Sequence, residues 1–168
     1  MKVSERLESL DVFRGITVAA MILVNNPGTW SHIYSPLRHA PWNGCTPTDL
    51  IFPFFLFIVG VSVHFSYQHK TEGLTQKVFL KILRRTLIIF GLGLFLSLFP
   101  KFDFSVVRVP GVLQRISIVF FFSSILYLTT GWLTQIRVAI LLLFVYYALM
   151  NFVPVPGLGE PHLEPGTN

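Results

Sequence analysis

Residues Thr46–Tyr67 read TPTDLIFPFFLFIVGVSVHFSY, a stretch with one acidic residue near its start and an aromatic, apolar run behind it. An apolar run of about 20 residues is the length that an α-helix needs to cross the hydrocarbon core of a bilayer. Thr46, Pro47 and Asp49 are the residue types preferred at the N-cap, the first and the third helical positions. The stretch therefore predicts a membrane-spanning helix with Asp49 as its capping acid.

The composition of the whole chain agrees with a membrane protein. Hydrophobic residues make up 52% of the sequence and charged residues 12%, whereas soluble domains carry about 25% charged residues. The net charge of +5 comes from basic residues gathered between hydrophobic runs, which is typical of membrane topology. The bilayer, and not nucleic acid, is the expected partner.

Four further hydrophobic runs extend this pattern along the chain. Together they predict an all-α, polytopic helix bundle with about five spans in a single domain, near residues 7–26, 49–67, 82–99, 112–128 and 138–153. The segment after Val153 is rich in Pro and Gly and ends without a further run.

The basic residues predict which loops lie on which side. The densest cluster lies between the second and third spans and comprises Lys70, Lys77, Lys81, Arg84 and Arg85. Cytoplasmic loops are enriched in Lys and Arg, so this connection and the N-terminus are expected to be cytoplasmic. The opposing loop carries Arg38 as its only basic residue and is expected to face outward. Lipid headgroups and a bound anion are both compatible with the basic cluster.

The outward loop contains the main candidate for chemistry, His39, within the sequence RHAPWNGCTPTD of residues 38–49. Imidazole exchanges protons and acts as a nucleophile near neutral pH. A loop histidine is more often without such a role, so His39 alone is only a candidate. A second role for Asp49, orienting or charging His39, is compatible with its capping role.

Other polar residues lie inside the predicted spans. Asp11, Arg14 and Asn25 share one face of the first helix, which should point into the bundle because a lipid-facing charge costs about 2.5 to 3.5 kcal/mol. Asp11 and Arg14 either form a structural ion pair or lie near a ligand. Arg115 sits near the start of the fourth helix, where the helix dipole disfavours a cation, so it either binds a partner or reaches toward the membrane surface.

No metal site is predicted. Cys45 is the only cysteine, so an intramolecular disulfide is impossible and a structural zinc site of the thiolate type is unsupported.

Several ordered blocks resemble the heparan-alpha-glucosaminide N-acetyltransferase family. They are Arg6–Gly15, Val24–Gly28, His39–Gly44, Asp49–Gly60 and Arg108–Arg115. The resemblance extends from about Arg6 to the end of the last hydrophobic run.

The resemblance implies acetyl transfer from cytoplasmic acetyl-CoA, the acyl donor, to an amino sugar or glycan on the far side of the membrane. His39 matches the motif histidine of the family, and with Asp49 it forms the expected catalytic pair, as nucleophile or general base. The remaining candidates are Asn25, Trp42, Asn43 and Arg115 for substrate, and Arg14 and Asp11 for the donor. The resemblance also implies a bacterial inner membrane and is compatible with a homodimer. It further implies that the chain is the N-terminal half of a longer protein, because family members continue with about as many helices again. We therefore expect residues 1–168 alone to be inactive.

Two other functions remain open. A sugar or acyl-sugar transporter would use Arg14, Asn25 and Arg115 along its path, and a non-catalytic homologue would keep the fold alone. Transporters place their polar groups at interrupted helices near the midplane. The concentration of polar residues in one outward loop around His39 favours transfer.

Overall fold

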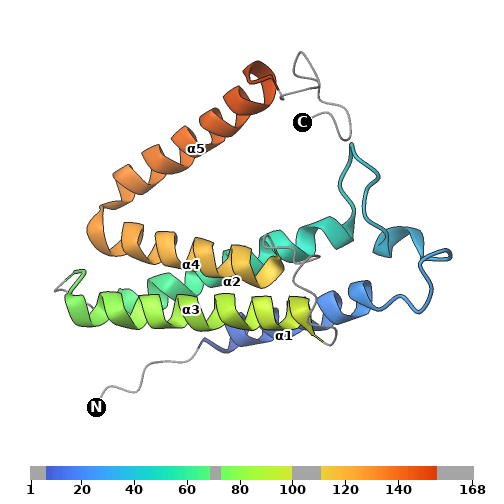
Figure 1. Cartoon of the computed structure of the whole chain (residues 1–168), viewed down its shortest axis with the longest axis horizontal. Helices are drawn as coiled ribbons and strands as arrows, with labels where there is room; N and C mark the ends of the chain where they lie inside the picture. Colours follow the sequence, from blue (N-terminus) through green and yellow to red (C-terminus); the bar gives the residue numbers. More distant parts are fainter. Residues whose placement is uncertain (1–6, 69–72, 100–110, 155–168) are drawn as a thin grey trace. The chain divides into compact units, whose positions relative to one another are not determined.

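The computed structural model describes residues 7–68, 73–99 and 111–154, and these ranges contain helices and loops without a strand. The helices are α1 (Glu8–Asn25), α2 (Pro47–Tyr67), α3 (Gln76–Leu98), α4 (Val112–Thr129) and α5 (Trp132–Phe152), with a short 3-10 helix, η1 (Ser35–Leu37), between α1 and α2 (Figure 1). The all-α prediction is confirmed. The chain divides within α4 into two compact units, residues 1–125 and 126–168, and the helix contacts and cavities described below lie in the first.

Three of the helices, α2, α4 and α5, are long and apolar enough to cross a membrane. α1 and α3 were also predicted to span but carry more charge. The charges of α3 lie near its N-terminal end and comprise Lys77, Lys81, Arg84 and Arg85. The uncharged part from Thr86 to Leu98 spans about 20 Å at about 1.5 Å per residue. Long basic side chains at the end of such a segment reach back toward the headgroups.

Two helices begin before the membrane spans predicted for them. α3 begins at Gln76 after Thr75, ahead of the span expected near residues 82–99, and α5 begins at Trp132 after Gly131, ahead of the span expected near residues 138–153. Polar and basic residues can occupy the first turns of a helix at a membrane surface, whereas the prediction followed only the apolar part. Residues 132–137, which lie between the spans predicted near 112–128 and 138–153, are thus helical. The loop expected after α3 lies largely outside the described residues, as does most of the C-terminal segment.

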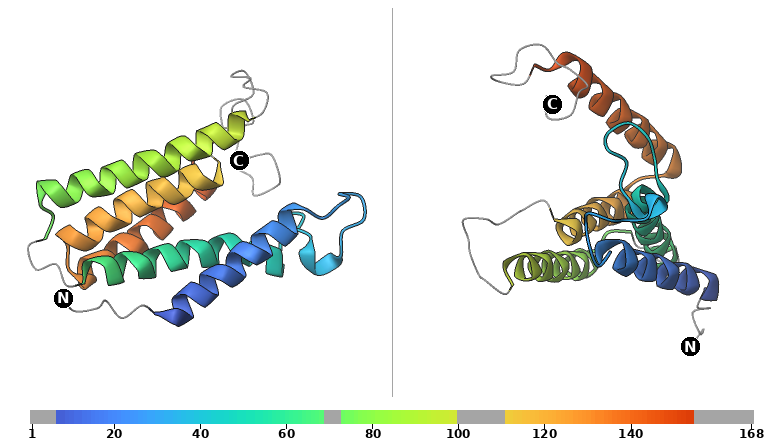
Figure 2. Two further views of the ribbon diagram at one scale, coloured as in Figure 1. Left: turned by 90° about the horizontal axis from the view of Figure 1, so that it is seen from below. Right: turned by 90° about the vertical axis from the view of Figure 1, so that its right-hand side faces the viewer.

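α1 packs against α2, as Figure 2 shows. The rings of Phe13 and Phe54 meet edge to face, with centroids 5.6 Å apart. The Nη2 group of Arg14, the next residue on α1, donates a hydrogen bond over 3.0 Å to the Oγ atom of Ser62, which lies about two turns beyond Phe54 on α2. The charged face of α1 therefore points toward α2, as the cost of a lipid-facing charge requires.

α3 approaches α4 closely at Gly93, which is buried. A Cβ atom at this position would lie 2.8 Å from Oε1 of Gln114 and 2.9 Å from Cβ of Leu113. Small residues allow the backbones of membrane helices to approach in this way. Further along the same pair, the rings of Phe79 and Phe121 lie 6.1 Å apart.

This approach predicts different effects for two neighbouring glycines. Gly93→Ala is expected to destabilise the protein by about 1 to 3 kcal/mol, because the Cβ atom of Leu113 cannot move by a rotamer change. Gly91 has no atom within 4 Å of an added Cβ, so Gly91→Ala should be neutral or stabilising by up to about 1 kcal/mol through helix propensity. Thermal unfolding of the full-length protein in detergent measures both. Equal melting temperatures for the two variants would contradict the close approach.

Candidate active site

The loop between α1 and α2 folds back onto the N-terminus of α2. The Oγ1 group of Thr48, which is buried, donates a hydrogen bond to the carbonyl oxygen of Pro36 over 3.2 Å. The backbone N–H of Ala40 donates to Oδ2 of Asp49 over 3.2 Å. Two consecutive residues of the first turn of α2 therefore hold two points of the loop, and His39 lies between these points.

Asp49 caps α2 as predicted. Its Oδ2 atom accepts hydrogen bonds from the backbone N–H and from the Oγ1 group of Thr46, each over 2.9 Å. The other carboxylate oxygen, Oδ1, lies 2.6 Å from Nδ1 of His39. One side chain thus satisfies the helix terminus with one oxygen and contacts the imidazole with the other, so the two proposed roles of Asp49 coexist in the geometry.

This contact fixes which nitrogen of His39 carries a proton. An ionised carboxylate can only accept hydrogen bonds, so Nδ1 must be the donor to Oδ1. In the neutral imidazole the other nitrogen, Nε2, then presents its lone pair. The side chain of His39 is 64% exposed, so it can exchange protons with water.

A cavity of about 150 Å³ lies beside His39. It is formed where the C-terminal end of α1 meets the first turns of α2 and α4. The described residues that line it are Met21, Val24, Asn25, His39, Thr48, Ile51, Phe52, Phe55 and Val112. The structure thus brings together His39 and Asn25, which the sequence proposed separately. We call this space the outer cavity.

Three other predicted residues lie apart from the outer cavity. Trp42 and Asn43 are exposed in the loop after His39, and Trp42 is 48% exposed. Arg115 is exposed on α4. None of the three is among the described residues that line the outer cavity.

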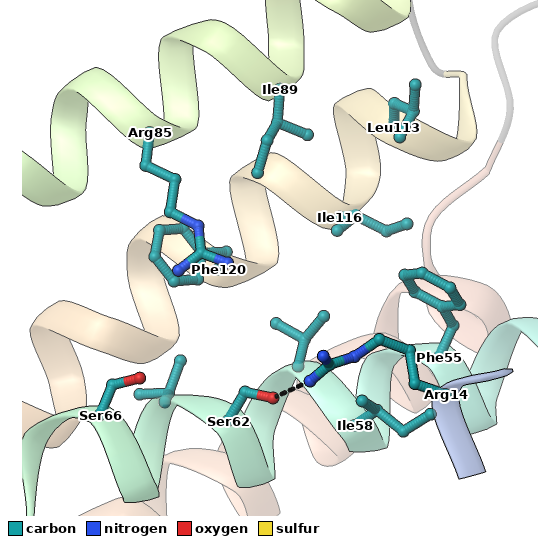
Figure 3. Close-up of a pocket in the computed structure, with 12 residues that line it drawn as sticks. Arg14, Phe55, Ile58, Ser62, Ser66, Arg85, Ile89, Leu113, Ile116 and Phe120 are labelled. Carbon is teal, nitrogen blue, oxygen red and sulfur yellow. Dashed lines mark hydrogen bonds between the residues drawn. The ribbon is translucent and has the colours of Figure 1, made fainter. Parts of the chain in front are cut away.

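A larger cavity of about 450 Å³ lies between α1, α2, α3 and α4 (Figure 3). Arg14 reaches it from α1, where its Nη1 group lies 3.2 Å from Oδ1 of Asp11. Arg85 reaches it from α3 with its guanidinium 4.8 Å from the ring centre of Phe120. The described residues of its wall include these two arginines and no acidic residue. We call this space the inner cavity; its wall favours an anion.

The polar wall of the inner cavity contains residues that the sequence analysis missed. Ser62 and Ser66 lie one turn apart on α2 and line it together with Arg85. Arg85 was grouped with the topology-determining basic cluster, since only the tertiary structure places it opposite Arg14. The spacing of the two serines on one face of α2 was the available clue. Across the described ranges, no three His, Cys, Asp or Glu side chains gather as a metal site.

Comparisons with known proteins agree with this architecture. A family profile described as heparan-alpha-glucosaminide N-acetyltransferase, catalytic, matches residues 6–160. The heparan-alpha-glucosaminide N-acetyltransferase of Mus musculus is 30% identical over 192 aligned positions, and that of Homo sapiens is 31% identical over 190. The alignments cover 97% and 96% of this chain but 28% of each relative, so the chain spans little more than a quarter of their length. The chain belongs to the heparan-alpha-glucosaminide N-acetyltransferase family.

Proposed function

We propose that the full-length protein is an integral membrane acetyltransferase that moves an acetyl group from cytoplasmic acetyl-CoA to an amino sugar or glycan on the extracytoplasmic side. The observation that carries this proposal is the 2.6 Å contact between His39 Nδ1 and Asp49 Oδ1 at the wall of the outer cavity. It leaves the lone pair of Nε2 for the reaction. In this proposal Asn25, which lines the same cavity, donates a hydrogen bond to the thioester oxygen as charge develops there.

The chemistry converts a thioester and an amine into an amide and a thiol. As a general base, His39 takes a proton from the acceptor amine, whose nitrogen forms a C–N bond to the acetyl carbon; the C–S bond of the donor breaks, and the proton ends on the CoA thiolate. As a nucleophile, it forms a C–N bond to the acetyl carbon, releases CoA and then passes the acetyl group to the amine. Both routes use Nε2 of His39 and need Nδ1 held by a carboxylate.

The inner cavity is the proposed binding site of the donor. Coenzyme A carries phosphates on a long, partly apolar arm, and the inner cavity combines Arg14 and Arg85 with apolar walls. Guanidinium groups bind phosphate through paired donors in a fixed geometry. Asp11 then acts by holding Arg14 through their 3.2 Å ion pair.

The proposed orientation places the N-terminus in the cytoplasm of a bacterial cell and the His39 loop outside its inner membrane. Support comes from the basic first turns of α3 and from the single basic residue of the His39 loop, as the positive-inside rule requires. The acceptor would then meet Trp42 and Asn43 from the outer aqueous side. Contact of Arg115 with the substrate stays a prediction, as does a homodimer.

The test is acetyl-CoA consumption by the purified full-length protein in detergent. With glucosamine as acceptor, we expect release of the CoA thiol together with formation of N-acetylglucosamine. Solute uptake into vesicles without any acyl donor, and no thiol release, would support a transporter instead. A folded protein with neither activity for any amino sugar would point to a non-catalytic homologue.

The donor site predicts unequal effects for two adjacent arginines. Arg85→Ala should raise the KM for acetyl-CoA about 10-fold or more, because a hydrogen bond to a charged group contributes about 1.5 to 3 kcal/mol. Arg84, its neighbour on α3, is absent from the inner cavity wall, so Arg84→Ala is the matched control and should leave KM unchanged. Steady-state kinetics with varied acetyl-CoA measure both. An equal rise for the two variants would indicate only a change in surface charge.

A further inference from the structure

One face of α2 lines both cavities along nearly the whole helix. Thr48 and Ile51 face the outer cavity, and Ser62 and Ser66 face the inner cavity. The distance along the helix from Thr48 to Ser66 is about 27 Å at about 1.5 Å per residue, close to the hydrocarbon thickness. The two cavities therefore follow each other along one helix face.

Phe55 lies where the two cavities meet. It is the one described residue that lines both. In Figure 3 its side chain stands at the end of the inner cavity, next to Arg14. On α4 the same boundary falls between Val112, which lines the outer cavity, and Leu113, which lines the inner cavity. The described residues at this boundary are thus apolar, and Phe55 is the one that lines both cavities.

We propose that Phe55 limits the size of the acyl group that can reach His39. This inference rests on the proposed function, in which the donor enters from the inner cavity. The acyl group is the leading end of the donor, so it must pass Phe55 before its carbonyl carbon meets Nε2 of His39. The transfer step itself is unchanged: the C–S bond breaks, the acceptor C–N bond forms, and the amine proton ends on the CoA thiolate.

The dimensions of the site favour a small acyl group. The outer cavity holds about 150 Å³, and Phe52 and Ile51 line it together with His39. An aromatic ring on a helix occupies one of few staggered χ1 positions, so a rotation of Phe55 opens the passage in a discrete step. Acetyl, with one methyl group, needs the smallest opening, whereas each added methylene must displace more of the ring.

The experiment compares full-length wild type with Phe55→Ala, Phe55→Leu and Phe55→Trp, and uses two readouts. The first is CoA thiol release from acetyl-, butyryl- and hexanoyl-CoA with glucosamine as acceptor. The second is thermal stabilisation by S-ethyl, S-butyl and S-hexyl coenzyme A thioethers, which bind without reacting. Phe57→Ala is the matched control, because Phe57 lies on the same helix, is 63% exposed and is absent from both cavity walls.

We expect wild type and Phe57→Ala to prefer acetyl-CoA and the S-ethyl thioether. Phe55→Ala should raise the hexanoyl-to-acetyl activity ratio at least 10-fold and shift the preferred thioether toward S-hexyl. The hexanoyl-to-acetyl activity ratio of Phe55→Leu should lie between those of wild type and Phe55→Ala. Phe55→Trp should have lower activity with butyryl-CoA than wild type. If Phe55→Ala does not fold, the hexanoyl-to-acetyl activity ratio must still rise in Phe55→Leu and fall in Phe55→Trp, relative to wild type.

The two readouts separate this inference from the proposed function. Transfer with an unchanged chain-length ratio in all folded Phe55 variants overturns the role of Phe55 and leaves the acetyltransferase intact. A shifted thioether preference without any thiol release supports the passage at Phe55 and overturns the proposed transfer. An unshifted thioether preference overturns the passage whatever the activity.

Discussion

His39→Ala is expected to lower the kcat of acetyl transfer about 10²- to 10⁴-fold, because the group that removes the amine proton or carries the acetyl group is lost. The fold should survive, since the side chain is 64% exposed. Asp49 also keeps its hydrogen bonds from Thr46 and Ala40 in the variant. The measurement is CoA thiol release by wild type and variant at matched melting temperature.

His32→Ala is the control for this substitution. His32 lies in the same loop and is exposed, and its Nδ1 lies 3.0 Å from Oγ of Ser31. It is absent from the wall of the outer cavity, so its removal should leave kcat unchanged. Equal activity of wild type and folded His39→Ala would show that His39 is a structural loop residue. It would favour a transporter or a non-catalytic homologue.

Asp49→Asn should lower kcat about 10²- to 10⁴-fold, within the range seen when a general base is lost or held in the wrong tautomer. Three donors, two from Thr46 and one from Ala40, converge on Oδ2. The single oxygen of the asparagine amide must therefore occupy that position, which turns its NH₂ group toward His39. Nδ1 then becomes the acceptor, Nε2 carries the proton, and the reacting lone pair is lost.

Thr46→Ala is the matched control, because it changes the helix cap and leaves the Asp49–His39 contact in place. It removes a cap side chain and should cost about 1 kcal/mol of stability, while the contact from Asp49 Oδ1 to His39 persists and kcat changes little. Asp49→Asn should keep most of the cap and lose activity. Nitrogen-15 chemical shifts of the imidazole report the tautomer directly. An Asp49→Asn protein with wild-type tautomer and wild-type kcat would show that Asp49 acts only on the helix.

The first turn of α2 shows why part of this site could be predicted from sequence. Thr46, Pro47 and Asp49 follow local rules for helix starts, and these rules depend on neighbours along the chain. The apolar length of α2 likewise depends only on local composition. The pairing of Asp49 with His39 was open in the sequence, since a loop of ten residues can close in many ways, and the bonds from Ala40 and to Pro36 select one.

Arg85 and α5 show why the wall of the inner cavity and the helix starts were not predictable from the sequence. The place of Arg85 opposite Arg14 depends on how α3 meets α4, which is set by the missing side chain of Gly93 against Leu113 and Gln114. No pattern within α3 encodes that contact. The start of α5 at Trp132 was not predicted, because hydropathy indicates where a helix enters the hydrocarbon and not where its backbone begins.

Because Asp49 contacts both the helix start and His39, the proposed reactivity of His39 depends on the first turn of α2 staying folded. Helix ends fray at a small fraction of the free energy needed to unfold a whole domain. When the first turn opens, Asp49 leaves both Thr46 and His39, and the imidazole loses its fixed tautomer at the same moment. Warming would then lower the proposed transfer activity through the transient opening of this one turn, while the rest of the helices stay folded.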